Sequence, residues 1–329
     1  MKFRPIGKSG IEASVVALGT WGIGGGPNWA DTDDAYSVGT IHKALDLGIN
    51  MIDTAPVYGN GHSEEMVGRA LKTVDRSKVI LSTKCGWWWK DDRGSEFMKR
   101  GDITLRRSLR PDTIREEIEM SFKRLGTDYI DIYFTHWPSI PPDLTPIAET
   151  MNCLLELKKE GKIRAIGISN VTTEQAKEYL DVGQVDVIQD KYSAIDRAKE
   201  CDLLPLCIEE GMAFMAYSPL EAGLLSGKIT MDTPVSVAQG NQPWMKPENR
   251  PRALAFIDKL RGLAEKYDCT VAQLAIAFSL EQPGVSHLLL GARRESTIIE
   301  NVKALDLTLE PADLVRIRGW AEALGTPTL

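Results

Sequence analysis

Two residues whose types can move a proton, Asp53 and Tyr58, lie in the segment Asn50–Glu65. The run Asn50–Ile52 is typical of a short buried strand, and it ends on the Asp53 carboxylate. A carboxylate at the end of an apolar strand is costly to bury unless a cationic group meets it. A loop with proline and glycine follows and carries the Tyr58 phenol. The segment therefore predicts an acid and a phenol at the mouth of one strand.

Lys84 and His136 end two further apolar runs, after the sequences VILST and YIDIYFT. A free tyrosine has a pKa near 10, about three units above neutrality, which corresponds to about 4 kcal/mol. Because a nearby ammonium favours the phenolate, we expect Lys84 to lower the pKa of Tyr58 and Asp53 to hold Lys84 in place. His136 is then expected to orient a carbonyl oxygen. Each residue alone is more often structural, whereas four of them at successive strand ends favour catalysis.

The elements that position these residues follow a regular alternation of short apolar runs and helical patterns. Eight strands that are each followed by a helix predict a parallel sheet with helices outside. Eight such repeats in a chain of 329 residues favour closure into a (β/α)8 TIM barrel within a single domain spanning residues 1–329, with a doubly wound sheet as the main alternative. The expected strands are Val15–Leu18, Met51–Ile52, Val79–Ser82, Tyr129–Phe134, Ile163–Ile168, Val185–Ile188, Ala213–Tyr217 and Ser286–Leu290.

The helical patterns lie between these strands. An N-terminal hairpin is expected over Lys2–Ala13, and Ser63 is expected to cap the helix that follows Tyr58. The expected helices are Asp34–Leu47, Ser63–Leu71, Pro111–Leu125, Thr145–Lys159, Thr173–Leu180, Lys199–Glu210, Pro251–Leu280 (two helices broken near Asp268), Glu295–Val302 and an appended Pro311–Leu324.

Three loops, Cys85–Arg110, Trp137–Pro146 and Leu220–Arg250, are longer than a barrel needs. Each follows a strand, so all three are expected on the C-terminal face, where barrel active sites are built. Loops of this length are usually functional or disordered. The glycine-rich Gly22–Gly26 lacks the GxGxxG spacing and an opening helix, which argues against a dinucleotide-binding Rossmann fold. We interpret it as a loop where backbone approaches a ligand.

Composition and charge narrow the class of protein. A formal net charge of −7 argues against a nucleic-acid partner. The N-terminus MKFRPIGKSG carries no apolar signal segment and no run is long enough to span a membrane, so we expect a cytoplasmic protein without a membrane partner. The five cysteines form no CxxC pair and predict reduced packing residues rather than disulfides. His42, His62 and His287 lack metal-ligand partners at sensible spacing, so no metal is expected.

The chain resembles the aldo-keto reductase family. IDTAPVYGNGHSE, LSTKCG and DIYFTHWP are similar to the family's segments that bear its catalytic Asp and Tyr, its Lys and its His. The likeness continues through LGTWGIGGG, RLGTDYID, EGKIRAIGISN, IQDKYS, AYSPLEAGLLSGK and GARRESTIIEN, and so covers almost the whole chain. HSEEMVGRAL and SPLEAGLLSGK resemble the bacterial branch of general and sugar-related reductases. The resemblance implies a (β/α)8 barrel and NADPH-dependent reduction of an aldehyde or ketone.

In the scheme that the resemblance implies, NADPH delivers hydride to the carbonyl carbon and Tyr58 donates a proton to its oxygen. Lys84 and Asp53 tune Tyr58, and His136 positions the substrate. Arg293 offers a fork suited to a 2′-phosphate, which favours NADPH over NADH, although Thr297 stands where many relatives have Gln. The cofactor-binding residues that carry over are Thr20, Trp21, Ser169, Asn170, Gln189, Tyr217, Ser218, Leu220, Gly223, Leu225, Lys228, Gly291, Arg293, Thr297, Glu300 and Asn301.

Several tryptophans fall in loops expected on the active face. Packing of the long loop and substrate contact are equally good explanations, and alternating side-chain directions would send at least one of Trp87–Trp89 outward. Aromatic platforms beside charged donors suit a polyhydroxylated aldehyde, so a small carbonyl compound such as a sugar aldehyde is the expected partner. The expected substrate-binding residues are Trp21, Trp87, Trp88 and Trp137.

Two other classes of function stay open. The first is a nucleotide-binding accessory or redox-sensing subunit with little turnover, against which the presence of all four catalytic residues argues. The second is a metal-dependent barrel hydrolase that uses Asp53 and His136, which lacks further ligands and leaves Lys84 unexplained. The sequence does not predict the oligomeric state.

Overall fold

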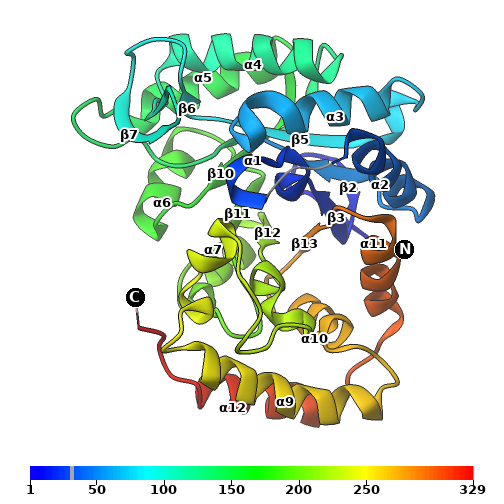
Figure 1. Ribbon diagram of the computed structural model, residues 1–329. Coiled ribbons are helices and arrows are strands. Elements are labelled where there is room, and N and C mark those ends of the chain that lie inside the picture. The colour runs from blue at the N-terminus through cyan, green and yellow to red at the C-terminus, as the bar shows by residue number, and fades with distance from the viewer. Residues whose placement is uncertain (30–32, 329) are drawn as a thin grey trace.

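A closed barrel of eight parallel strands forms the centre of the protein (Figure 1). The computed structural model describes residues 1–29 and 33–328. Each expected strand is present to within three residues at its ends, and the doubly wound alternative is wrong because β13 pairs with β3 and closes the sheet. In order around the barrel the strands are β3 (Val16–Gly19), β4 (Met51–Asp53), β5 (Ile80–Cys85), β9 (Ile130–Thr135), β10 (Ile163–Ser169), β11 (Val187–Lys191), β12 (Ala213–Tyr217) and β13 (His287–Gly291).

Helices surround this barrel, as the alternation predicted (Figure 1). The long expected helix over Pro251–Leu280 is two helices, and Asp268 between them has a φ of 47° that no helix continues through. The helices are α1 (Gly26–Trp29), α2 (Asp34–Asp46), α3 (His62–Leu71), α4 (Pro111–Leu125), α5 (Ile147–Lys159), α6 (Thr173–Val182), α7 (Leu203–Glu210), α8 (Val237–Gly240), α9 (Arg250–Lys266), α10 (Val271–Leu280), α11 (Glu295–Val302) and α12 (Pro311–Glu322).

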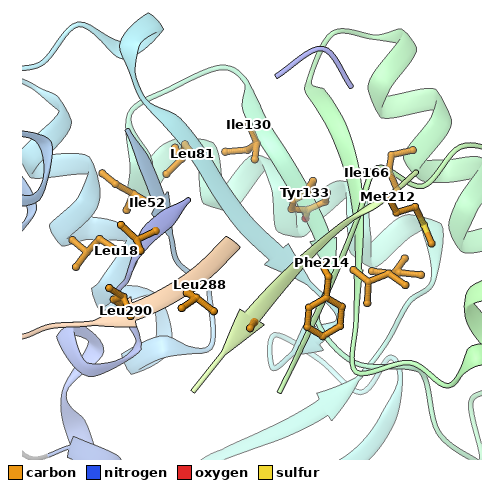
Figure 2. Packing of buried hydrophobic residues seen from close by; sticks show 14 of the residues in the cluster. Leu18, Ile52, Leu81, Ile130, Tyr133, Ile166, Met212, Phe214, Leu288 and Leu290 are labelled. Carbon is orange, nitrogen blue, oxygen red and sulfur yellow. The ribbon is translucent and has the colours of Figure 1, made fainter. Parts of the chain in front are cut away.

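Successive residues of each barrel strand bury their side chains in two different layers. One set faces outward against the helices, and Figure 2 shows Leu18, Ile52 and Leu81 of this layer. The alternate set fills the barrel interior and includes Met51 and Ile80. Fully burying one such aliphatic side chain stabilises the fold by about 1.5–3 kcal/mol. This period-two burial on both faces explains why the strands read as continuous apolar runs.

The N-terminal hairpin closes one end of the barrel. Strands β1 (Phe3–Pro5) and β2 (Glu12–Ser14) pair antiparallel, which confirms the expected hairpin. Ile6 and Ile11 at its tip are buried and belong to the same cluster as the interior barrel residues. The opposite, carboxyl-terminal end of the strands is therefore the open end at which a site can form.

The expected loop Cys85–Arg110 is not irregular. It contains a three-stranded antiparallel sheet in the order β6 (Trp87–Trp88), β8 (Ile103–Arg107) and β7 (Ser95–Arg100). Four consecutive residues of β7 are exposed, so this strand has no alternating apolar pattern that the sequence could reveal. The strand forms because β8 supplies its backbone partners.

Two local expectations for the first loops are wrong. Gly22–Gly26 was expected to open no helix, but the 3-10 turn η1 (Trp21–Gly24) covers most of it and the single-turn α1 begins at Gly26. Ser63 does not cap α3: the helix starts one residue earlier, and Gly61, with a φ of 104°, precedes it. The Ser63 hydroxyl instead donates to Thr20, which follows the neighbouring strand β3.

Two features are absent from the described residues. In residues 1–29 and 33–328, no helix combines the length and apolar character that crossing a membrane requires. Within the same residues, no three His, Cys, Asp or Glu side chains gather as they would around a metal ion.

Candidate active site

The four residues expected to be catalytic meet at the carboxyl ends of three neighbouring strands. Asp53 ends β4, Lys84 is the penultimate residue of β5, and His136 directly follows β9. Tyr58 begins the 3-10 turn η2 (Tyr58–Gly61), which leads from β4 towards α3. The ring centroids of Tyr58 and His136 are 5.8 Å apart, and the Lys84 ammonium lies 5.0 Å from the Tyr58 ring centroid.

A buried ion pair forms the base of this group. The Lys84 ammonium donates to Asp53 Oδ2 at 2.7 Å and to the carbonyl of Thr54 at 2.8 Å. The second oxygen of Asp53 accepts from the Ser82 hydroxyl at 2.8 Å and from the Gln189 amide at 3.0 Å. A buried ion pair is tolerated when such additional hydrogen bonds satisfy both charges.

The expected direction of the Tyr58 pKa is wrong. Burial raises the pKa of Tyr58 well above its usual value, and the nearby negative charge of Asp53 raises it further. Burial also lowers the pKa of Lys84, with the charge of Asp53 opposing that shift. The Asp53 carboxylate offsets part of the charge of the Lys84 ammonium, which therefore does not outweigh the loss of water around the phenol. Tyr58 is accordingly a protonated phenol at neutral pH.

His136 is buried and neutral. Burial lowers its pKa well below the usual range, and the positive charges of Lys84 and Arg107 add to this shift. The backbone amide of His136 donates to the carbonyl of Cys85 at 2.9 Å, which fixes the residue against β5. Its Nδ1 has no hydrogen-bond partner among the residues that the structure describes. A neutral imidazole can still donate one hydrogen bond to a carbonyl oxygen.

Backbone packing between η1 and η2 positions Tyr58. A Cβ at Gly24 would lie 2.7 Å from the carbonyl carbon of Tyr58 and 2.9 Å from the nitrogen of Gly59. A Cβ at Gly59 would in turn lie 2.1 Å from the carbonyl oxygen of Gly24. The two turns approach so closely because both residues lack side chains. Gly59 of IDTAPVYGNG and Gly24 of LGTWGIGGG therefore help to fix the position of the Tyr58 phenol.

The residues expected to hold the carboxamide end of a cofactor form one connected shelf. Asn170 donates through Nδ2 to the carbonyl of His136 at 2.8 Å and to the Ser169 hydroxyl at 3.0 Å. The Tyr217 hydroxyl donates to Asn170 Oδ1 at 2.7 Å, and Ser169 donates to the carbonyl of Gln189 at 2.7 Å. The structure therefore brings these four residues together beside Asp53 and His136. Thr20 lies nearby and donates to the Asp53 carbonyl at 2.8 Å.

The expected pyrophosphate strap follows β12 and is tightly turned. Ser218, Glu221 and Ala222 all have a positive φ, between 49° and 55°. Leu225 is fully buried, so only its backbone is available to a ligand. The remaining expected residues of this strap are Leu220, which is half-buried, Gly223, which has a φ of 97°, and Lys228, which is exposed.

The adenosine end of the expected site lies at β13 and α11. Lys228 of the strap forms an ion pair with Glu300 at 3.3 Å. Arg293 donates to the carbonyl of Trp29 at 2.7 Å, and its guanidinium lies 6.0 Å from the Trp29 ring centroid. Asn301 is buried, and its Nδ2 has no partner among the described residues. An unused buried amide of this kind fits a bound adenine. The other expected residues here are Gly291 at the end of β13 and Thr297 in α11.

The expected substrate residues differ in their surroundings. Trp87 faces His136 with 6.4 Å between ring centroids, and Trp21 lies 6.5 Å from Tyr58. Trp137 belongs with Trp87 to one small apolar cluster. Trp88, however, is buried and donates to Asp91 at 2.6 Å, which is the pattern of a loop-packing residue.

Beside Trp21 the surface is hollowed into a cavity of about 220 Å³. Its lining comes from η1, η2, the start of α3 and β7, and includes Asn60, His62 and Arg100. His62 is the first residue of α3, and its imidazole lies 3.0 Å from the carboxylate of Asp34 in α2.

Two buried acids that support the site were not singled out in the sequence. Glu117 accepts from the backbone of Gly86 at 2.8 Å and so holds the start of the long loop. Its place on the buried face of α4, between Ile114 and Ile118, was a detectable signal. Glu221 is buried in the strap, where it pairs with Lys191 at 2.9 Å. Nothing in the sequence around Glu221 separates it from a solvated loop acid.

The chain is similar to several bacterial proteins. Over 325 residues the chain is 48% identical to the NADH-specific methylglyoxal reductase of Escherichia coli, covering 98% of this chain and 99% of that protein. It is 40% identical over 298 residues to the aldo-keto reductase YhdN of Bacillus subtilis, covering 89% and 86%. The structure of a glycerol dehydrogenase from Gluconobacter oxydans superposes with a TM-score of 0.86 at 37% identity, covering 99% of this chain and 96% of that one.

Residues 15–322 match the model of the aldo/keto reductase family. That match spans the eight barrel strands, the strap and the four residues at the barrel mouth. The chain belongs to the aldo/keto reductase family.

Proposed function

We propose that this protein reduces a small aldehyde or ketone to an alcohol with a reduced nicotinamide cofactor, and that Tyr58 donates the proton. The observation that carries the proposal is the arrangement at the barrel mouth: a protonated phenol stands over the buried Lys84–Asp53 pair and against a neutral imidazole. This arrangement supplies the proton that carbonyl reduction requires, and the bound cofactor supplies the hydride.

The residues divide the work as follows. His136 donates a hydrogen bond to the substrate oxygen and fixes the carbonyl beside Tyr58. Tyr58 transfers its proton to that oxygen as negative charge develops there. The Lys84 ammonium, 5.0 Å from the Tyr58 ring, then stabilises the phenolate. The raised pKa of the free phenol keeps the proton in place until the carbonyl oxygen becomes basic.

The cofactor-binding residues support a nicotinamide placed on the shelf of Ser169, Asn170, Gln189 and Tyr217. The amide and hydroxyl groups of this shelf can hold a carboxamide, and the Tyr217 ring offers a face for stacking. Because Gln189 also bonds to Asp53, the shelf lies directly beside the proton-transfer group. Asn301 and the strap from Ser218 to Lys228 would hold the rest of the molecule.

For the choice of cofactor we propose that the chain uses both NADPH and NADH, with a preference for NADPH of about tenfold or less. Arg293 offers the guanidinium that a 2′-phosphate needs, but it is already committed in part to Trp29. Thr297 adds no charge, and the carboxylate of Glu300 lies on the same helix. The NADH-specific relative supports a weak preference. The ratio of kcat/KM for the two cofactors measures it, and a clear preference for NADH would contradict the proposal.

For the substrate we propose a small polar carbonyl compound, with sugar aldehydes included. Trp87, Trp137 and Trp21 supply apolar walls near Tyr58, while Arg100 of β7 and Arg107 of β8 supply donors. The names of the relatives, a methylglyoxal reductase and a glycerol dehydrogenase, are consistent with compounds of this size.

The test is the Tyr58→Phe variant. We expect kcat for a small aldehyde to fall by about 10²–10⁴-fold, because a positioned general acid contributes about that much. Cofactor binding, followed by quenching of tryptophan fluorescence, is expected to stay within about twofold, since the hydroxyl is the only group removed. Tyr36→Phe, on the exposed surface of α2, is the matched control. Normal turnover by Tyr58→Phe contradicts the proton-donor assignment, and an inactive wild type that still binds nucleotide identifies an accessory subunit instead.

A further inference from the structure

Arg107 is a buried cation surrounded by aromatic rings. Only 8% of its surface is exposed, and it ends β8 between the partner strands β6 and β7. Its guanidinium carbon lies 4.2 Å from the ring centroid of Phe97, 4.7 Å from that of Trp137 and 5.2 Å from that of Trp87. Contacts of this kind attract a cation, but they leave its N–H donors unused.

No carboxylate among the described residues pairs with Arg107, and its Nε lacks any hydrogen-bond partner there. Other arginines of the same loop are paired: Arg93 contacts Asp91 at 2.8 Å, and Arg106 contacts Glu96 at 3.7 Å. Burying an arginine without a counter-charge is costly, and the burial lowers its pKa. The unpaired charge therefore needs an explanation that packing of the loop does not supply.

This cation lies at the wall of the active site. Trp87 contacts Arg107 on one side and His136 on the other, with 6.4 Å between the Trp87 and His136 rings. Trp137 follows His136 in the chain, and Tyr58 packs against the same apolar cluster as both tryptophans. Phe97, which covers the guanidinium, is 45% exposed. The ring that covers Arg107 is thus itself partly at the surface.

We propose that Arg107 binds the carboxylate of an oxo-acid substrate whose aldehyde or ketone carbonyl lies between Tyr58 and His136. The proposal rests on the proposed reductase function and names its substrate class. A carboxylate would accept two parallel hydrogen bonds from the guanidinium fork, and the rings of Trp87, Phe97 and Trp137 would exclude water from that pair. Arg107 is then a specificity residue that touches the substrate away from the reacting carbon.

The first experiment uses the wild-type enzyme. Succinic semialdehyde is compared with its methyl ester, which has nearly the same shape but no charge. We expect kcat/KM for the acid to exceed that for the ester by about tenfold or more, and the advantage to shrink as NaCl is raised. A wild type that reduces the ester as well as the acid, at every salt concentration, overturns the proposal.

The second experiment uses variants of Arg107. Arg107→Met keeps the length and apolar contacts of the side chain, and we expect kcat/KM for the acid to fall by about ten- to a hundredfold through KM. The ester is expected to change by less than about threefold, and Arg107→Lys is expected to recover part of the loss. Arg106→Met is the matched control. Arg106 precedes Arg107 in β8, so its side chain points to the opposite face of the sheet. Equal losses for acid and ester would assign Arg107 to packing alone.

These outcomes separate the inference from the proposed function. If neither compound is reduced but NADPH binds, the reductase proposal itself fails. If the ester is reduced and the acid has no advantage, the reductase proposal stands and the carboxylate site is wrong. If Arg107→Met does not fold, inhibition of the wild type by succinate against succinamide gives the same comparison, and equal inhibition overturns the proposal.

Discussion

The Asp53 carboxylate uses both of its oxygens on three donors that come from two strands. Lys84 and Ser82 belong to β5, and Gln189 belongs to β11, across the barrel. Because each donor is fixed by its strand, the carboxylate has no freedom to turn away from the ammonium. Lys84 is consequently held under Tyr58 before any ligand arrives, which is the preorganisation that stabilisation of a phenolate requires.

Also at the residue scale, we expect the guanidinium of Arg293 to account for the preference for NADPH over NADH. We expect Arg293→Ala to raise KM for NADPH about tenfold while KM for NADH changes by less than about threefold, since only the 2′-phosphate loses a charged partner. Steady-state kinetics with both cofactors measure the change, and Lys303→Ala at the end of α11 is the control. Equal effects on both cofactors would remove the role of Arg293 in recognising the phosphate.

Residue types predicted the chemistry of the site better than its electrostatics. Asp53 and Lys84 could be paired from the sequence because a charge at the end of an apolar strand needs a partner. The pKa of Tyr58 could not be predicted, because its direction depends on how completely the phenol loses water. Arg107 stood among many charged residues of one loop, and only the structure shows that no carboxylate of residues 1–29 and 33–328 pairs with it.

Among the elements, the contact between η1 and η2 sets the position of the phenol. We expect Gly24→Ala to lower kcat by about tenfold or more while the fold is retained, because the new methyl group would displace the backbone of Tyr58 and Gly59. The Gly24 φ is not in the left-handed region, so strain of residue 24 itself is not the cause. Gly319→Ala in α12, where a Cβ meets nothing within 4 Å, is the control.

Kinetics and circular dichroism of the two variants are the measurements. An active Gly24→Ala variant would show that the turns are free to separate, and a variant with lost ellipticity would show that they are needed for folding. Either result would contradict the assigned role.

Elements with strong patterns were predicted and those without were missed. The buried strands are continuous apolar runs, and the helices α4 and α11 carry clear apolar faces, so their bounds agree with the sequence. Strand β7, with the sequence SEFMKR, lies almost wholly at the surface. Its existence depends on hydrogen bonds to β8, and such pairing leaves no trace in the residue types.

At the scale of the whole molecule, the N-terminal hairpin closes one end of the barrel, and a histidine is buried there. His287 begins β13, is fully buried and has its Nε2 3.3 Å from the carbonyl of Arg4 in the hairpin. Burial lowers the pKa of His287 to about 4, and the charge of Arg4 adds to this. The unfolded chain, with a pKa near 6.5, therefore binds a proton that the folded chain does not.

We expect the free energy of unfolding to decrease as the pH falls from about 6.5 to about 4, and His287 contributes about 3 kcal/mol to that decrease. His136, whose pKa is also lowered by burial, acts in the same direction. In His287→Gln this pH dependence is expected to be shallower, whereas His42→Gln on α2 is expected to keep it. Urea unfolding at a series of pH values is the measurement, and an unchanged dependence in His287→Gln would contradict the assignment.

The amide of Asn170 has one further consequence. It receives the hydroxyl of Tyr217 on one side and grips the carbonyl of His136 on the other, so β9, β10 and β12 are joined through one side chain. A ligand that tilts the Tyr217 ring would therefore also move the backbone of His136. Binding at two sites that are coupled in this way is thermodynamically reciprocal. If one compound changes the affinity of the protein for a second by some factor, the second changes the affinity for the first by the same factor.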